Sequence, residues 1–237
     1  MTAAPQALFF DVFGTCVDWR TSVAREVAAL AARLGRGDVD GEAVADAWRA
    51  RYQPQMETVR SGARPWVDLD VLHREALDDV LAQAGFDEVS GGDRDALTRA
   101  WHRLDPWPDT VPGLLRLKAA AVIAPHSNGH VALLLAMARR AGLPWDLILG
   151  AETAGAYKPE PRSYLRNAEL VRLPPGEVMM VAAHNGDLHA AAAVGMRTAF
   201  VLRPTEHGPG QTTDLAPDGD WDVVAGDLVD LAAQLGA

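Results

Sequence analysis

The sequence predicts an α/β protein whose parallel sheet carries helices on both faces and receives an inserted block of helices. An apolar run at residues 7–12 is followed, from about 20 to 104, by helical patterns alone, and from 105 onward strand and helix patterns alternate. Alternating units of this kind are typical of a covered parallel sheet. A chain of 237 residues that is 49% hydrophobic is long enough to bury such a core.

The first expected strand is residues 7–12, ALFFDV, because a short apolar run that ends at a turn is typical of a buried strand. Asp11 should therefore lie near the carboxyl end of this strand. The next block repeats apolar residues at i, i+3, i+4 and i+7, which indicates amphipathic helices. The expected helices are 23–34, 42–60, 68–85 and 93–104.

The second half of the chain pairs strands with helices after a proline-rich hinge at 105–113. The pairs are 120–127 with 130–142, 146–150 with 161–171, and 177–184 with 187–195, followed by a strand at 197–202. The long segment 203–221 is either a functional loop or a solvated surface excursion, and its composition favours the second.

The order of elements predicts two domains. Residues 1–17 and 105–237 should form the sheet domain, and residues 18–104 an inserted helical cap. Ligands of open parallel sheets bind beyond the carboxyl ends of the strands. Asp11, Ser127 and the segment VAAHNGD, 181–187, are therefore expected to converge.

Charge and composition exclude several classes of partner. With 22 basic and 32 acidic residues the net charge is −10, so the chain has no basic field for nucleic acid or an anionic membrane. No apolar run reaches the roughly 18 residues of a membrane helix. The single cysteine, Cys16, cannot form an internal disulfide, and no leader opens the chain, which predicts a cytoplasmic protein with a small-molecule ligand.

Four motifs occur at successive expected strand ends: DVFGT (11–15), HSNG (126–129), YKPEPRSY (157–164) and AAHNGD (182–187). In this order, with a helical insertion after the first, they resemble the haloacid dehalogenase superfamily. The resemblance covers nearly the whole chain and implies a Rossmann-like core with an inserted helical cap. The motif residues carried over are Asp11, Thr15, Ser127, Asn128, Lys158, Tyr164 and Asp187.

Phe13 separates this chain from the phosphatases of that superfamily. Their first motif has a second acid at this position, which protonates the leaving oxygen, and a phenyl ring cannot donate a proton. A halide leaves without a proton, so the pattern resembles the (S)-2-haloacid dehalogenases, also called type II. Asp187 is followed by LHAAAA, which offers no further acid, and Mg²⁺ prefers several oxygen ligands. We therefore expect neither a metal nor another cofactor.

The resemblance implies a role for each motif residue. Asp11 would attack the α-carbon and form an ester that water then cleaves with inversion overall. Lys158 would keep Asp11 ionised, whereas Thr15 either orients that carboxylate or is only a turn residue. Ser127 and Asn128, with the backbone N–H groups of the next helix, would hold the substrate carboxylate, although such a pair is also a common helix N-cap.

For the halide-binding arginine and for Tyr164, the sequence leaves alternatives open. In AWRARYQ, 47–53, the resemblance favours Arg49 as the residue that takes up the halide or the substrate charge, with Arg51 and Arg20 as competitors. Tyr164 either lies near the site or packs its ring in the core.

Two departures from the family lie in the last motif. His184 stands where an asparagine is usual, and Gly186 where a tryptophan packs against the halide. His184 would donate to the leaving halide, align the hydrolytic water or be structural. Both changes lead us to expect that fluoroacetate is accepted.

The expected function is hydrolysis of short (S)-2-haloalkanoic acids, haloacetates included, to 2-hydroxy acids. The alternatives are another hydrolase of the same fold, either a phosphatase or an enzyme that opens a strained ring next to a carboxylate, and a non-catalytic binding module. Phe13 argues against a phosphatase, and the joint presence of Asp11, Lys158 and Asp187 argues against a module without activity. The resemblance also suggests a homodimer.

Overall fold

The computed structural model describes residues 4–237, and the chain folds into two compact units. The core unit comprises the chain up to Asp18 together with Pro106–Ala237, and the cap unit comprises Trp19–Asp105. The first three residues of the expected range 1–17 lie outside the described residues. Within residues 4–237, no helix combines the length and apolarity that a membrane span requires.

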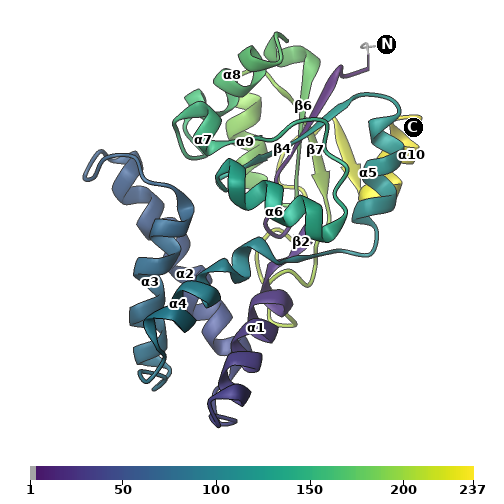
Figure 1. The fold of residues 1–237 in the computed structure, drawn as a ribbon. Helices are drawn as coiled ribbons and strands as arrows, with labels where there is room; N and C mark the ends of the chain where they lie inside the picture. Colours follow the sequence, from purple (N-terminus) through teal and green to yellow (C-terminus); the bar gives the residue numbers. More distant parts are fainter. Residues whose placement is uncertain (1–3) are drawn as a thin grey trace. The chain divides into compact units, whose positions relative to one another are not determined.

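The core unit is built on a six-stranded sheet with the order β5-β4-β1-β6-β7-β8 (Figure 1). Every neighbouring pair in this sheet is parallel. The strands are β1 (Ala7–Phe10), β4 (Val122–Ser127), β5 (Leu149–Gly150), β6 (Val178–Ala182), β7 (Arg197–Val201) and β8 (Val223–Ala225). Two short strands, β2 (Val17–Asp18) and β3 (Asp105–Pro106), form a separate two-stranded sheet.

Strand β1 lies in the middle of the sheet and is buried over its whole length, as the uninterrupted apolar run ALFF requires. Phe10 pairs with Pro125 of β4 on one side and with Val181 of β6 on the other. This register places the carboxyl ends of the three strands at one edge of the sheet. The segments that follow Phe10, Pro125 and Val181 along the chain therefore meet at that edge.

Helices cover both faces of this sheet, and Figure 1 shows α5 and α10 beside each other on one side, with α7, α8 and α9 on the other. Buried side chains such as Phe9, Tyr164, Met180 and Phe200 form a hydrophobic cluster. The helices are α5 (Thr110–Lys118), α6 (Val131–Ala141), α7 (Ala151–Ala154), α8 (Pro161–Leu170), α9 (Asn185–Ala193) and α10 (Leu228–Gln234), with a 3₁₀ turn η2 (Pro175–Glu177).

The cap unit consists of α1 (Trp19–Arg33), α2 (Gly41–Arg60), α3 (Leu69–Gln83) and α4 (Gly91–Thr98), with a 3₁₀ turn η1 (Arg99–His102). Asp40, Asp68 and Ser90 cap the N-termini of α2, α3 and α4 by accepting backbone hydrogen bonds.

The cap has an aromatic interior of its own. The ring centroid of Trp101 lies 4.4 Å from that of His73, 5.5 Å from that of Trp48 and 6.2 Å from that of Trp19. Aromatic contacts of this kind hold α1, α2 and α3 to η1.

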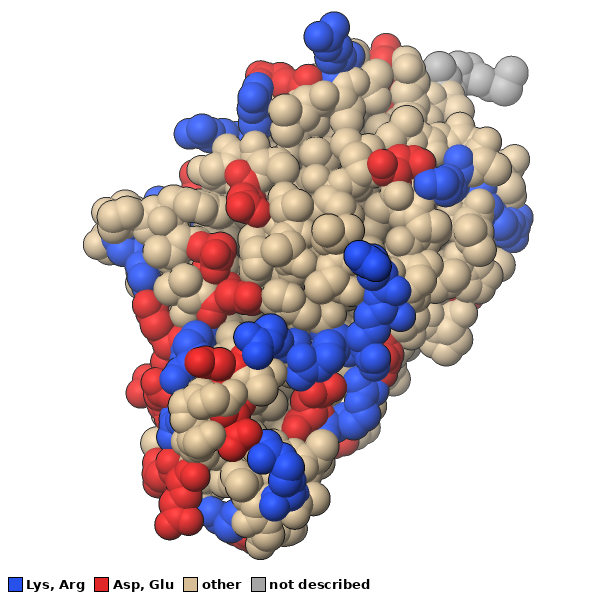
Figure 2. Space-filling view, viewed as in Figure 1, with Lys and Arg blue, Asp and Glu red and all other residues tan. Residues whose placement is uncertain are grey.

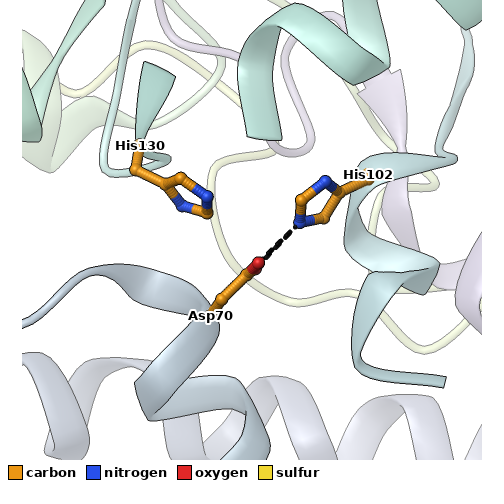
Figure 3. A group of neighbouring side chains, drawn as sticks. All are labelled: Asp70, His102 and His130. Carbon is orange, nitrogen blue, oxygen red and sulfur yellow. Dashed lines mark hydrogen bonds and ion pairs between the residues drawn. The ribbon is translucent and has the colours of Figure 1, made fainter. Parts of the chain in front are cut away.

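Charged side chains of both signs are mixed on the surface of the cap (Figure 2). Many of them are paired, as in the ion pairs of Arg33 with Asp93 and of Arg64 with Glu75. His102 Nε2 of η1 also lies 2.9 and 2.8 Å from the two carboxylate oxygens of Asp70 in α3 (Figure 3). Such exposed pairs contribute little stability individually, but they account for the strongly charged composition of the segment.

The fold differs from the expectation in a few places. The expected strand 146–150 is reduced to two residues in β5, and the expected hinge 105–113 contains the first turn of α5. Neither β8 nor α10 was predicted. Proline is tolerated in the first turn of a helix, where an N–H has no intrahelical partner, and this explains why Pro112 does not prevent α5.

Candidate active site

Asp11 is the first residue after β1, and its backbone N–H donates to Val181 O of β6 at 2.9 Å. The Thr15 hydroxyl donates to Asp11 Oδ2 at 2.7 Å. That hydroxyl in turn accepts a hydrogen bond of 2.9 Å from Ala183 N–H, so its hydrogen is directed at the carboxylate. Of the two interpretations of Thr15, the geometry favours orientation of Asp11.

Lys158 bridges two carboxylates. Its Nζ lies 2.8 Å from Asp11 Oδ1 and 2.5 Å from Asp187 Oδ2. The Lys158 side chain is 8% exposed, and those of Asp11 and Asp187 are 9% and 8% exposed. The backbone of Lys158 is held by a separate contact, because its main-chain N–H donates to Asn128 Oδ1 at 2.8 Å. Three residues from three different motifs thus form one buried ionic group.

The environment drives the pKa values of the two acids apart. Burial alone would raise the pKa of Asp11, but the charge of Lys158 and a hydrogen bond from His184 hold it well below its ordinary value. Burial and the charge of Asp11 raise the pKa of Asp187 despite its contact with Lys158. Asp11 is consequently ionised as a nucleophile must be, whereas Asp187 is the better proton acceptor.

Lys158 and Tyr164 complete this group. Burial would lower the pKa of Lys158, but the charges of Asp11 and Asp187 raise it above its ordinary value. Tyr164 OH donates to Asp187 Oδ1 at 2.5 Å, and burial followed by the Asp187 charge raises the pKa of the phenol. Tyr164 therefore fits both interpretations: its ring is buried in the core, and its hydroxyl contacts Asp187 in the site.

Ser127 ends β4, and Asn128 follows it. Ser127 Oγ accepts from Gly129 N–H at 3.1 Å, which leaves the hydroxyl hydrogen for another acceptor. Asn128 Oδ1 is engaged by Lys158 N–H, so the amide Nδ2 is the end that can bind an anion. Fewer backbone N–H groups at the start of α6 remain for the substrate carboxylate than predicted, because Val131 N–H already donates to a Glu152 carboxylate oxygen at 2.7 Å.

His184 immediately precedes α9, and both of its ring nitrogens contact carboxylates. Nδ1 lies 3.0 Å from Asp11 Oδ2, and Nε2 lies 2.9 Å from Glu206 Oε2. Burial would lower the pKa of His184, but the Glu206 charge and the hydrogen bond with Asp11 raise it well above the ordinary value. With both nitrogens engaged, the geometry favours a role on the nucleophile over donation to the halide.

Sequence reasoning missed Glu206 and Arg203, which belong to the loop 203–221. Glu206 is 1% exposed and Arg203 is 7% exposed, so the interpretation of this loop as a solvated excursion is wrong for these two residues. Arg203 Nε donates to Thr15 O at 2.8 Å, and its two terminal nitrogens bind Asp109 at 2.8 and 2.7 Å. Arg203 therefore fixes the turn that carries Thr15. Neither residue belongs to one of the four motifs, and their hydrogen-bond partners are distant in the sequence. No local pattern could therefore identify them.

Phe13 and Cys16 lie in the turn after Asp11, and both are buried. Cys16 Sγ donates to Asp11 O at 3.2 Å. Burial raises the pKa of the Cys16 thiol far above its ordinary value, which removes it as a nucleophile. The Phe13 ring offers no proton where a second acid would stand.

The three candidate arginines all belong to the cap unit. The Arg49 guanidinium lies over the aromatic rings of Tyr52 and Trp19, 4.2 and 5.3 Å from their centroids. Arg20 is held by Asp46 and Glu42 through contacts of 2.7 to 3.0 Å. Arg20 is thus already paired with two acids, which makes Arg49 the better candidate for binding an anion.

The site has the residues and topology of a known enzyme family. The family model of the haloacid dehalogenase-like hydrolases matches residues 5–195, which span β1 to α9 and include the Asp11, Lys158 and Asp187 group. The chain belongs to this family.

Within the haloacid dehalogenase-like hydrolases, the similar proteins include several (S)-2-haloacid dehalogenases and also phosphatases. The (S)-2-haloacid dehalogenase 1 of Pseudomonas sp. (strain CBS-3) is 30% identical over 84% of this chain and 85% of its own. A defluorinating L-2-haloacid dehalogenase has a crystal structure that is 57% identical, with a TM-score of 0.96 over 98% of this chain and 96% of that one.

A second similar structure carries a covalently bound ligand. The L-2-haloacid dehalogenase of Xanthobacter autotrophicus has been solved with chloropropionic acid covalently bound. It is 25% identical to this chain, with a TM-score of 0.81 over 98% of this chain and 99% of that one. The parallel sheet with its helices is therefore the haloacid dehalogenase-like fold, as the sequence predicted.

Proposed function

We propose that this protein hydrolyses short (S)-2-haloalkanoic acids to 2-hydroxy acids through an ester on Asp11. The observation that carries the proposal is the ionised Asp11 held by Lys158, with Phe13 in place of a proton donor. A nucleophile without an acid suits a leaving group that departs as a stable anion. The similarity to (S)-2-haloacid dehalogenases supports the same reaction.

The first step is displacement at the α-carbon. Among residues 4–237, Asp11 Oδ1 forms a hydrogen bond with Lys158 only, whereas Oδ2 contacts both Thr15 and His184. We infer that Oδ1 attacks, because the oxygen with fewer donors is the better nucleophile. A Cα–O bond forms as the carbon–halogen bond breaks, and the halide leaves with the bonding electrons. Inversion follows from attack opposite the halide.

Two groups are proposed to bind the substrate. Ser127 and Asn128 would bind the substrate carboxylate through the hydroxyl hydrogen and the amide Nδ2. Arg49 would take up the halide or the substrate charge, because its guanidinium carries a full charge on an aromatic platform.

The second step is hydrolysis of the ester at Asp11 Cγ. Asp187 accepts the proton of the attacking water, the Cγ–Oδ1 bond breaks, and the product alkoxide takes a proton from Lys158. The proton on Asp187 then returns to Lys158, whose Nζ lies 2.5 Å from Asp187 Oδ2. The second water proton stays on the new Asp11 carboxyl and is then released to solvent, because the overall reaction yields one proton together with the halide. Asp11 keeps one oxygen from water.

A divalent metal does not fit this group of residues. The two motif acids share the Lys158 ammonium, which already lies at hydrogen-bond distance from each of them. Mg²⁺ requires several oxygen ligands, and α9 offers no acid after Asp187. We therefore propose that catalysis is independent of added metal.

We also propose that fluoroacetate is a substrate. The 57% identical structure is described as defluorinating. The family resemblance implies that His184 and Gly186 stand where an asparagine and a tryptophan are usual, which changes the donors and the volume at the halide. The predicted cytoplasmic location and the homodimer remain predictions. Fractionation of the producing cells and light scattering of the purified protein test them.

A halide-release assay tests the function. Purified enzyme is given chloroacetate, (S)-2-chloropropionate, fluoroacetate and a generic phosphate monoester, with and without exhaustive chelation. We expect halide release from the haloacids, no phosphate release, and rates unchanged by the chelator. Phosphate release that requires Mg²⁺ would contradict the proposal, and release from the chloroacids without fluoride would reject only the fluoroacetate claim.

A further inference from the structure

Glu206 is a buried acid that the proposed reaction does not yet use. Its carboxylate is 1% exposed and faces the turn that follows Asp11. Gly14 makes room for it, because a Cβ at Gly14 would lie 2.1 Å from Glu206 Oε1. A buried carboxylate is costly unless it is paired. The partners of Glu206 are His184 Nε2 at 2.9 Å and, more distantly, His207 Nε2 at 3.6 Å.

His184 satisfies two carboxylates only when both of its nitrogens carry hydrogen. A neutral imidazole has one N–H and can donate to one partner, whereas the imidazolium donates to two. Nδ1 faces ionised Asp11, and Nε2 faces Glu206. The doubly protonated ring is therefore the form that fits this geometry. Lys158 and Asp187 lie on the other side of Asp11 and complete the surrounding charges.

We propose that Glu206 is a positioning residue that keeps His184 doubly protonated, so that His184 Nδ1–H and the Thr15 hydroxyl together bind the oxyanion formed on Asp11 Oδ2 during ester hydrolysis. The inference rests on the proposed dehalogenase function. Both donors already lie at Oδ2, at 3.0 and 2.7 Å. Prearranged donors of this kind lower the barrier because they need no reorganisation as the charge develops.

The step balances without proton transfer through His184. The water oxygen bonds to Asp11 Cγ, the carbonyl electron pair moves onto Oδ2, and the water proton goes to Asp187. When the pair returns, the Cγ–Oδ1 bond breaks and Lys158 protonates the product oxygen. The other water proton remains on the Asp11 carboxyl and is released to solvent, which restores the ionised nucleophile. His184 stays charged throughout and strengthens its hydrogen bond to Oδ2 while the negative charge is there.

Glu206 matters most in the second half of the cycle. In the resting enzyme Asp11 and Glu206 both favour the charged ring. Once Asp11 is an ester it carries no charge, and Glu206 is the acid that still contacts His184. Loss of Glu206 should therefore slow hydrolysis of the ester much more than its formation.

The test compares Glu206→Gln with Asp214→Asn. Asp214 belongs to the same loop and holds Asn185 through hydrogen bonds of 2.9 and 3.0 Å, so its substitution makes the same acid-to-amide change next to α9 without touching His184. Rapid-quench reactions with chloroacetate follow chloride release and glycolate formation separately. Intact-protein mass spectrometry follows the ester on Asp11.

We expect Glu206→Gln to slow glycolate formation by on the order of 10²-fold, the loss typical of one oxyanion donor. Chloride should still be released in a first-turnover burst, and the ester should accumulate. Asp214→Asn should behave as the parent enzyme does. Equal slowing of both steps in Glu206→Gln, or no accumulation of ester, would overturn the proposal.

A second measurement can be made on the parent enzyme alone and extended to Glu206→Gln. In protein labelled with ¹⁵N-histidine, the two ring nitrogens of parent His184 should both report protonation at pH 7.5, and in Glu206→Gln the ring should deprotonate at lower pH. A neutral His184 ring in the parent at pH 7.5 would overturn the proposal even if Glu206→Gln does not fold. If the parent released no halide, the dehalogenase function itself would fail, which this titration distinguishes from a failure of the His184 assignment.

Discussion

Lys158 shows how one side chain organises the site. It neutralises two buried acids at once, and it holds Asp11 in the ionised form that attack requires. The same contacts make it the proton donor nearest the product oxygen. Because both acids are nearly excluded from solvent, water cannot replace the ammonium as a counter-charge.

Replacement of Lys158 by methionine should therefore reduce halide release by on the order of 10² to 10³. With the Lys158 charge removed, of the pair Lys158 and His184 only His184 still opposes the effect of burial, so the pKa of Asp11 rises and the acidic limb of the pH profile of halide release should move to higher pH. Lys118→Met is the matched control, because Lys118 pairs with Asp146 and Pro144 O outside the site. Halide release measured against pH checks both variants, and an unmoved acidic limb in Lys158→Met would contradict the role of the ammonium.

At the scale of elements, the turn after β1 is the part of the fold on which the site depends most. It carries Asp11, Gly14 and Thr15, and Arg203 fixes it from the loop after β7 by donating to Thr15 O. Gly14 has φ +88°, a left-handed conformation that side chains other than glycine rarely adopt. It also leaves the space that the Glu206 carboxylate fills.

Gly14→Ala should both strain the backbone and displace Glu206. The left-handed conformation costs about 1 to 3 kcal/mol for alanine. Gly195→Ala is the control, because Gly195 has φ +84° and a Cβ there would meet nothing within 4 Å. Both variants should lose similar stability in denaturant unfolding, but only Gly14→Ala should accumulate the ester with chloroacetate. Rapid ester hydrolysis in Gly14→Ala would show that the position of Glu206 is unimportant.

The sequence was sufficient to predict those elements whose pattern is local. The strand before Asp11 and the helices α6, α8 and α9 follow from apolar runs and helical periodicity. The motifs were expected at strand ends, which holds for Asp11 after β1, whereas Lys158 lies between α7 and α8 and Asp187 lies in the first turn of α9. The three residues of β8 are too few to show a pattern, and the two-residue β5 is set by its neighbour β4. These elements are fixed by tertiary contacts rather than by local preference.

The same reason limited the prediction of the site. Glu206 and Arg203 act through contacts with residues 22 and 188 positions away, His184 and Thr15, and nothing in the loop sequence reveals those contacts. His184 was recognised as a departure from the family, but its contact with Glu206 was not predicted. The role that the geometry favours for His184 therefore required the structure.

The whole molecule consists of two units with separate interiors. The cap unit buries its own aromatic cluster around Trp101. Its two ends are joined within the unit, since the N–H of Asp105, its last residue, donates at 2.9 Å to Oγ of Ser22 in the first turn of α1. A segment whose ends meet and whose core is its own is expected to fold independently.

A fragment of residues 19–105 should accordingly be helical by circular dichroism and should melt in one cooperative transition. Trp101→Ala removes the ring that contacts Trp19, Trp48 and His73, and such a deletion costs about 3 to 5 kcal/mol, enough to abolish the transition. Trp66→Ala, at a tryptophan that is 37% exposed, should keep it. A fragment without a cooperative transition would show that the cap needs the core unit to fold.

The covalent role of Asp11 is the central claim for the molecule as a whole, because the turn, Lys158 and the His184 contacts all serve that carboxylate. A single turnover in H₂¹⁸O with enzyme in excess over chloroacetate tests it most directly. The glycolate hydroxyl should carry ordinary oxygen, taken from Asp11, and the label should appear in the Asp11 carboxylate. Glycolate labelled with ¹⁸O in that first turnover, with Asp11 unlabelled, would mean that water attacks the carbon directly and would contradict the claim.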